Sequence, residues 1–290
     1  LTAILIASFY MIVIGWILKY IFLSFGTLPS TAQEAGAMFG GLVEGNFLSV
    51  FICFSIVFLT VFYVVSKGIK SGIERLNILM MPSLFILLIG LLLYAIFASG
   101  NFTQALSFIF IPDFSKLLNA ELILQALGLA FFSMSMGVGT VATYAASLPD
   151  GTHRVNSTFS IVFINILIGI MMGLVVFSFI PIIDGQPASE GAGLIFVSLT
   201  SLFAQMGIIG NILAIAFFIS LLFAGITSAV SMIEPFALYL IHKFQLSRNS
   251  AIMIIEVFVY ILGTLCILSY YGVTSNYFSI PAAALGNEKP

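Results

Sequence analysis

The sequence contains very few charged residues, and this scarcity excludes a water-soluble fold. Only 7% of its 290 residues are Asp, Glu, Lys or Arg, whereas 61% are hydrophobic and the mean hydropathy is +1.22. A soluble domain carries about 25% charged residues. A chain with so few charges cannot cover the surface of a soluble fold of this size, so the sequence predicts an all-α polytopic membrane protein.

Basic residues, cysteines and catalytic motifs are scarce as well. The net charge of −2 is uninformative about nucleic acid, but the sequence has no basic patch that could bind it, so nucleic acid is not expected as a partner. The only cysteines, Cys53 and Cys266, lie in separate apolar runs, where packing is a commoner role than a disulfide or a metal site. No HExxH or GxSxG pattern occurs, and no acid pair lies at mid-membrane, so we do not expect an enzyme.

Long apolar runs are what the sequence has instead. Seven stretches of about 20 mainly apolar residues predict transmembrane helices. They cover roughly residues 1–25, 47–66, 77–98, 119–148, 157–182, 208–241 and 250–271. The sixth is longer than a bilayer requires, which predicts a tilt or an extension beyond the membrane. We expect residues 1–271 to form a transmembrane core and 272–290 an external tail.

Shorter segments connect these spans. The amphipathic stretch 102–110 predicts an interfacial helix, because it is too short to cross a bilayer. Residues 26–46 and 182–207 are expected to be external loops. The sequence begins at Leu1, inside an apolar run and without a signal-peptide pattern, so we expect a fragment or a chain whose start is missing.

The distribution of basic residues predicts the orientation. Six of the nine lysines and arginines follow the second, fourth and sixth spans: Lys67, Lys70, Arg75, Arg154, Lys243 and Arg248. Loops enriched in Lys and Arg stay in the cytoplasm. We therefore expect a multi-pass protein of the cytoplasmic (inner) membrane whose first span runs from inside to outside.

The segment FFSMSMGVGTVATYAA, residues 131–146, places glycine and serine inside the fourth span. These residues weaken a helix, and in hydrocarbon the freed backbone groups must find partners. The pattern indicates a helix that unwinds at mid-membrane, with half-helix ends that attract a carboxylate and a cation. The alternative is a kink that packs flexibly and binds nothing.

The sixth span contains a second polar cluster in LLFAGITSAVSMIEP. The Ala224 carbonyl and the Thr227 and Ser228 hydroxyls fall on one helical face. Such oxygen atoms suit a hard cation such as sodium. The alternative is that the hydroxyls bond to carbonyls of the preceding turn and serve only packing.

Four further polar residues lie in predicted spans. Asn165 is the only amide in the core of the fifth span, and the Tyr10 hydroxyl needs a partner when buried. Glu234 and Glu256 are intramembrane acids, which mark candidate functional sites. Both fall near the predicted cytoplasmic interface, where we expect partial hydration.

At these residues the chain resembles the neurotransmitter:sodium symporters, and their bacterial amino-acid members in particular. The matching segments, in order, are SFYMIVIGW, SKGIKSGIERLNILMMPSLFIL, IPDFSKLLNAELILQALGLAFFSMSMGVGTVATYA, and LLFAGITSAVSMIEP followed by KFQLSRNSA. The family has twelve helices, the first ten forming two inverted repeats. The resemblance implies a partial leucine-transporter-like fold that corresponds to family helices three to nine and lacks helices 1, 2 and 10–12.

The resemblance also implies the binding residues. The implied sodium ligands are Ser133 and Asn165 at a first site, and Ala224, Thr227 and Ser228 at a second. The implied substrate-binding residues are Ile6, Tyr10, Phe132, Ser135, Val138, Ser228 and Met232. In the family the tyrosine at the position of Tyr10 holds the substrate carboxylate, and the missing first helix supplies half of both sodium sites.

Four positions depart from the family pattern. Val138 stands where an aromatic residue often closes the pocket, which implies a larger pocket here. Leu129 and Gly169 replace residues used by chloride-dependent members, so chloride binding is not supported. His242 stands where an acid contributes to the internal gate; a hydrated interfacial histidine is expected.

The predicted function is sodium-coupled symport of an amino acid or related small molecule across the lipid bilayer of the cytoplasmic membrane by alternating access. The alternative is a truncated, non-transporting remnant of a transporter gene or a membrane scaffold. A channel is disfavoured because the polar groups form compact clusters rather than a stripe along one path. The amino acid, the number of ions and the oligomeric state stay open.

Overall fold

The computed structural model describes residues 2–112, 114, 119–136, 139–146, 148, 153–180, 182–183, 186–187 and 191–270. Within these residues the structure is helical apart from one antiparallel pair of two-residue strands, β1 (Ile182–Ile183) and β2 (Gln186–Pro187). The all-helical architecture expected from the composition is therefore confirmed.

Six of the described helices are long and apolar enough to cross a membrane. They are α1 (Thr2–Leu23), α3 (Phe47–Ser66), α4 (Glu74–Ala98), α8 (Arg154–Phe179), α11 (Ile208–Phe244) and α12 (Arg248–Tyr270). The predicted fourth span is divided into α6 (Ala120–Ser133) and α7 (Thr140–Ala146). The 37 residues of α11 extend over about 55 Å, well beyond a hydrocarbon core of about 30 Å.

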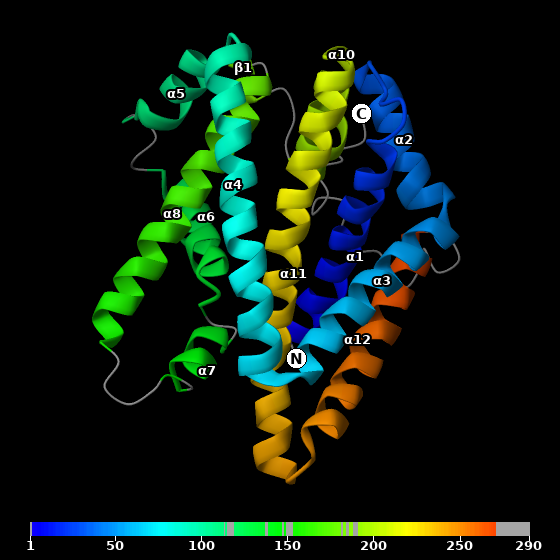
Figure 1. The fold of residues 1–290 in the computed structure, drawn as a ribbon, viewed down its shortest axis with the longest axis vertical. Coiled ribbons are helices and arrows are strands. Elements are labelled where there is room, and N and C mark those ends of the chain that lie inside the picture. The colour runs from blue at the N-terminus through cyan, green and yellow to red at the C-terminus, as the bar shows by residue number, and fades with distance from the viewer. Residues whose placement is uncertain are drawn as a thin grey trace.

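The helix α1 lies at the centre of the bundle, in contact with α3, α11 and α12 (Figure 1). On the other side α4 packs on α11, and α8 packs on α4 and on the short helix α5 (Phe102–Phe110). The end of α3, the starts of α4 and α8, and the α11–α12 turn all lie at one end of the molecule (Figure 1). We call this the basic end, because the loops rich in Lys and Arg are there.

The prediction that residues 26–46 and 182–207 are loops is wrong. They contain α2 (Ala32–Gly45), the short helices α9 (Gly191–Gly193) and α10 (Thr200–Gln205), and a π-helical turn, η3 (Leu194–Leu199). The start of α2 has a local cause: the Thr31 side chain accepts a hydrogen bond from the Glu34 N–H at 3.2 Å. A Thr followed three residues later by Glu is the capping-box signal for a helix start.

The only tryptophan packs against both α2 and η3 and so connects them to the bundle. Trp16 of α1 is 1% exposed. Its ring packs edge-on against Phe39 of α2 at 5.6 Å and against Phe196 of η3 at 6.2 Å between centroids. Aromatic pairs in this arrangement add stability beyond the area they bury. The segments predicted as loops are therefore part of the folded core.

Gly15 allows α1 to approach the backbone of α3. A Cβ atom at this position would lie 3.0 Å from the Phe54 backbone nitrogen and 3.2 Å from its Cα. Small residues permit such close helix contacts in membranes. Because the backbone of α3 cannot yield as a side chain can, Gly15→Ala is expected to lower the free energy of unfolding by about 1–3 kcal/mol.

Gly90 provides the matched control for this prediction. It lies inside α4, and a Cβ there would meet nothing within 4 Å. Gly90→Ala is expected to leave stability unchanged or to raise it slightly, since alanine favours a helix over glycine. Unfolding of both variants in mixed detergent micelles, followed by circular dichroism, measures the difference; equal effects would contradict the close contact at Gly15.

Candidate functional site

The predicted break in the fourth span is present at the end of α6. The Met136 N–H bonds to the Phe131 carbonyl at 2.9 Å, and the Ser135 N–H bonds to the Phe132 carbonyl at 3.0 Å. This is the Schellman pattern that ends helices, and its left-handed position is usually a glycine. Here Ser135 occupies it with φ +52°. Such a backbone costs of order 1 kcal/mol or more and is frequent at functional sites.

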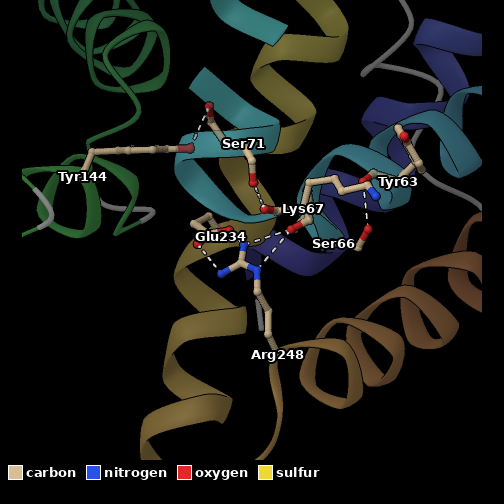
Figure 2. Close-up of polar contacts among 9 residues, drawn as sticks. Tyr63, Ser66, Lys67, Ser71, Tyr144, Glu234 and Arg248 are labelled. Atoms are coloured by element: carbon tan, nitrogen blue, oxygen red, sulfur yellow. Dashed lines mark hydrogen bonds and ion pairs between the residues drawn. The ribbon is translucent and has the colours of Figure 1, made fainter. Parts of the chain in front are cut away.

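The helix after the break, α7, contacts α11. Gly139 has φ +84° and precedes the first residue of α7. The Tyr144 hydroxyl of α7 donates to Ser231 Oγ of α11 at 3.5 Å, a long contact. Tyr144 also borders a pocket beside α4 and the π-helical turn η1 (Ile69–Ile73), towards which its side chain extends (Figure 2). The half-helix α7 therefore packs on α11 and borders the pocket beside α4.

The structure brings together the two residues assigned to the first sodium site. Asn165 Nδ2 of α8 lies 3.4 Å from Ser133 Oγ, the last residue of α6, and 3.4 Å from Met134 Sδ. The contact with Ser133 Oγ is longer than a typical N–H···O hydrogen bond. The Asn165 amide oxygen takes part in neither contact. Two uncharged oxygen groups, one from each helix, are thus available beside the break for a hard cation.

The second predicted sodium cluster lies on one turn of α11. Thr227 Oγ1 donates to the carbonyls of Phe223 and Ala224, both at 3.0 Å. This is the intrahelical bonding that the sequence left open as the packing alternative. A hydroxyl that donates still has lone pairs for a cation. The Thr227 oxygen and the Ala224 carbonyl oxygen, 3.0 Å apart, are close enough to touch one ion at metal–oxygen distances of about 2.4 Å.

Four of the predicted substrate-binding residues face one another across α1 and α11. The Tyr10 side chain of α1 lies near the Ser228 side chain of α11, which is exposed. Ile6 lies one turn before Tyr10, and Met232 lies one turn after Ser228; both are half-buried. Residues four apart share a helical face. The two helices therefore present paired stripes, each with one hydroxyl and one apolar side chain.

The α6–α8 pair and the α1–α11 group remain separate in the described part of the chain, where no hydrogen bond joins them. No side chain of α6 is buried, and Phe132 is 54% exposed. Ser135 is half-buried in the break, while Val138 lies outside the described residues. His242 is exposed near the end of α11.

The expectation that Glu234 and Glu256 are partly hydrated is wrong: they are 0% and 2% exposed. Arg248, the first residue of α12, donates to both carboxylate oxygens of Glu234, at 3.0 and 2.6 Å (Figure 2). It also donates to the Val65 carbonyl at the end of α3, at 2.9 and 3.3 Å. Sequence reasoning missed this partner, since no motif links an acid inside α11 to the start of the next helix.

These features define a class: a multi-pass helical membrane protein with one helix broken beside a pair of uncharged oxygen groups and a second oxygen cluster on another helix. The family model described as the sodium:neurotransmitter symporter family matches residues 41–278, and the chain belongs to this family.

Individual relatives agree with this assignment. The chain is 34% identical over 274 residues to the uncharacterized sodium-dependent transporter YhdH of Bacillus subtilis, and 32% identical over 270 residues to the uncharacterized sodium-dependent transporter MJ1319 of Methanocaldococcus jannaschii. These matches cover 94% and 86% of the chain, but 59% and 54% of the relatives. The crystal structure of MhsT in complex with L-phenylalanine is similar at 32% identity and a TM-score of 0.82, over 96% of this chain and 63% of that one. The chain thus spans about three fifths of the relatives' length.

Proposed function

We propose that this chain carries the core of a sodium-coupled symporter for an amino acid. The contact of Asn165 with Ser133 across the helix break is the observation that carries the proposal, because it gathers uncharged oxygen ligands where backbone groups are freed. The relatives described as sodium-dependent transporters support the ion, and the MhsT complex with L-phenylalanine supports an amino acid as substrate.

In the proposed mechanism each cluster has a separate task. Ser133 and Asn165 bind one sodium ion near the substrate carboxylate, which the Tyr10 hydroxyl also holds. Ala224, Thr227 and Ser228 bind a second ion. The side chain of the substrate lies among Ile6, Phe132, Ser135, Val138, Ser228 and Met232. Because the first ion and the carboxylate attract each other, each raises the affinity of the other.

The sodium gradient and the membrane potential then drive uptake, with one helix bundle rocking against the rest. We place the protein in the cytoplasmic membrane with the basic end in the cytoplasm, because Lys-rich and Arg-rich loops stay inside.

Binding of a labelled amino-acid mixture in sodium and in potassium tests this proposal. The protein is expected to bind amino acid in sodium only. Asn165→Ala is expected to weaken that binding at least tenfold, since a ligand bond to a charged group contributes about 1.5–3 kcal/mol. Asn156→Ala, an exposed change on the same helix, is the control and is expected to bind like the unaltered protein. Equal binding in both salts would contradict the proposal.

A non-transporting scaffold is the second candidate, and two observations favour it. No side chain of α6 is buried. Within the described residues, no hydrogen bond joins the α6–α8 pair to the α1–α11 group. Under this candidate a well-folded chain binds no amino acid in either salt. Sodium-dependent binding would contradict it, so the same assay separates the two functions.

A further inference from the structure

Glu256 of α12 is a buried acid without a partner among the described residues. It is 2% exposed, and neither carboxylate oxygen makes a hydrogen bond there. Glu234, equally buried, differs in being fully paired with Arg248. Glu256 lies eight residues, or about 12 Å, along α12 from its first residue. A buried acid without a partner is costly and marks a candidate site.

A groove runs beside this residue between α3 and α12. Its volume is about 390 Å³, within the range of small-molecule pockets. The walls are mainly apolar and include Phe58 and Phe62 of α3 and Ile261 of α12. Leu59 and Val257, on the rim, are 61% and 54% exposed, so the groove opens on the outer surface of the described chain.

Three polar side chains line this groove. Tyr260 is one turn beyond Glu256 and therefore on the same face of α12. Its hydroxyl is hydrogen-bonded to Ser55 Oγ of α3 at 2.9 Å. The Tyr260 ring lies 4.7 Å from the Phe58 ring, centroid to centroid, so aromatic faces border the polar group. The groove thus combines one acid, a hydroxyl pair and three aromatic rings with apolar walls.

We propose that this groove binds a small hydrophobic primary amine that enters from the bilayer. An ammonium group supplies three donors and a positive charge, which is what an unpaired carboxylate beside two hydroxyl oxygens lacks. In the complex the Glu256 side chain turns into the groove and binds the ammonium, while Phe58 and Tyr260 offer cation–π contact. The apolar body lies along α3 and α12.

This site is independent of the proposed transport site. None of the residues assigned to sodium or to the amino-acid substrate lies on α3 or α12. The test is therefore made in potassium and without amino acid, so that failure of the symport proposal leaves it unaffected.

The experiment measures binding of labelled 1-adamantylamine to the full chain in phosphatidylcholine nanodiscs, with neutral 1-adamantanol as the comparison. The amine is expected to bind saturably, with one site per chain, and at least tenfold more tightly than the alcohol. Glu256→Gln is expected to reduce the affinity for the amine to that for the alcohol. Glu121→Gln removes an exposed acid at the start of α6 and is the matched control, with unchanged affinity expected.

Equal affinities for the amine and the alcohol would overturn the proposal, as would an unchanged affinity in Glu256→Gln. Leu59→Trp provides a second test, because it keeps the carboxylate and fills the groove from its exposed rim. The affinity of this variant for the amine is expected to be at least tenfold lower. The test remains available if Glu256→Gln does not fold. Retained affinity in Leu59→Trp would also overturn the proposal.

Discussion

Replacing Arg248 with alanine is expected to lower the free energy of unfolding by about 3–5 kcal/mol, because it leaves a buried carboxylate without its positive partner. The Glu234 side chain is 0% exposed and that of Arg248 is 26% exposed. The arginine also donates to the Val65 carbonyl, so its loss leaves a second group at the end of α3 without this donor. One side chain therefore joins α3, α11 and α12 at the basic end (Figure 2).

Unfolding in mixed detergent micelles, followed by circular dichroism, measures this loss. Arg75→Ala is the matched control, because Arg75 is an exposed arginine at the same end of the bundle; its effect is expected within about 0.5 kcal/mol. The double variant Glu234→Gln with Arg248→Gln removes both charges and is expected to regain part of the stability. A loss below 1 kcal/mol in Arg248→Ala would show that the carboxylate finds another partner or water.

The spans could be predicted from the sequence because the bilayer restricts the choice of structure. Backbone groups in hydrocarbon must bond within their own segment, so an apolar run of about 20 residues becomes a helix. The predicted ranges 47–66 and 102–110 coincide with α3 and α5. The helix α2 was missed because its 14 residues are too few for a span, although the capping-box pair Thr31 and Glu34 marked its start.

Candidate site residues were predictable where one helix brings them together. Ala224, Thr227 and Ser228 share a turn, so helical spacing alone groups them. Pairings between helices depend on packing that no local pattern encodes. Ser55 and Tyr260, for example, are 205 residues apart in the chain. The pairing of Asn165 with Ser133 was expected only through the family resemblance, and the structure places the two side chains in contact.

Combining Thr227→Val with Ser228→Ala is expected to weaken sodium-dependent binding about 100-fold. The two substitutions remove both hydroxyl ligands of the proposed second sodium site and keep the Ala224 carbonyl. A hydrogen-bonding oxygen that contacts a charged group contributes about 1.5–3 kcal/mol, so losing two corresponds to at least 3 kcal/mol. Fold loss is not expected, because the Thr227 hydroxyl donates only within its own helix and valine has nearly the same shape.

The measurement is the sodium concentration that gives half-maximal binding of a labelled amino acid. The control combines Ser220→Ala with Thr264→Val, which removes two hydroxyls whose intrahelical bonds are equivalent: Ser220 donates to Ala216 and Thr264 to Tyr260, both at 2.8 Å. The control is expected to keep its sodium dependence. If the Thr227 and Ser228 variant also keeps it, these hydroxyls serve packing alone, and sodium must be bound by the Ser133 and Asn165 pair or elsewhere. If the Thr227 and Ser228 variant loses its sodium dependence and the control keeps it, the effect depends on where the two hydroxyls lie and not on how many are removed. An ion site at Thr227 and Ser228 requires this result.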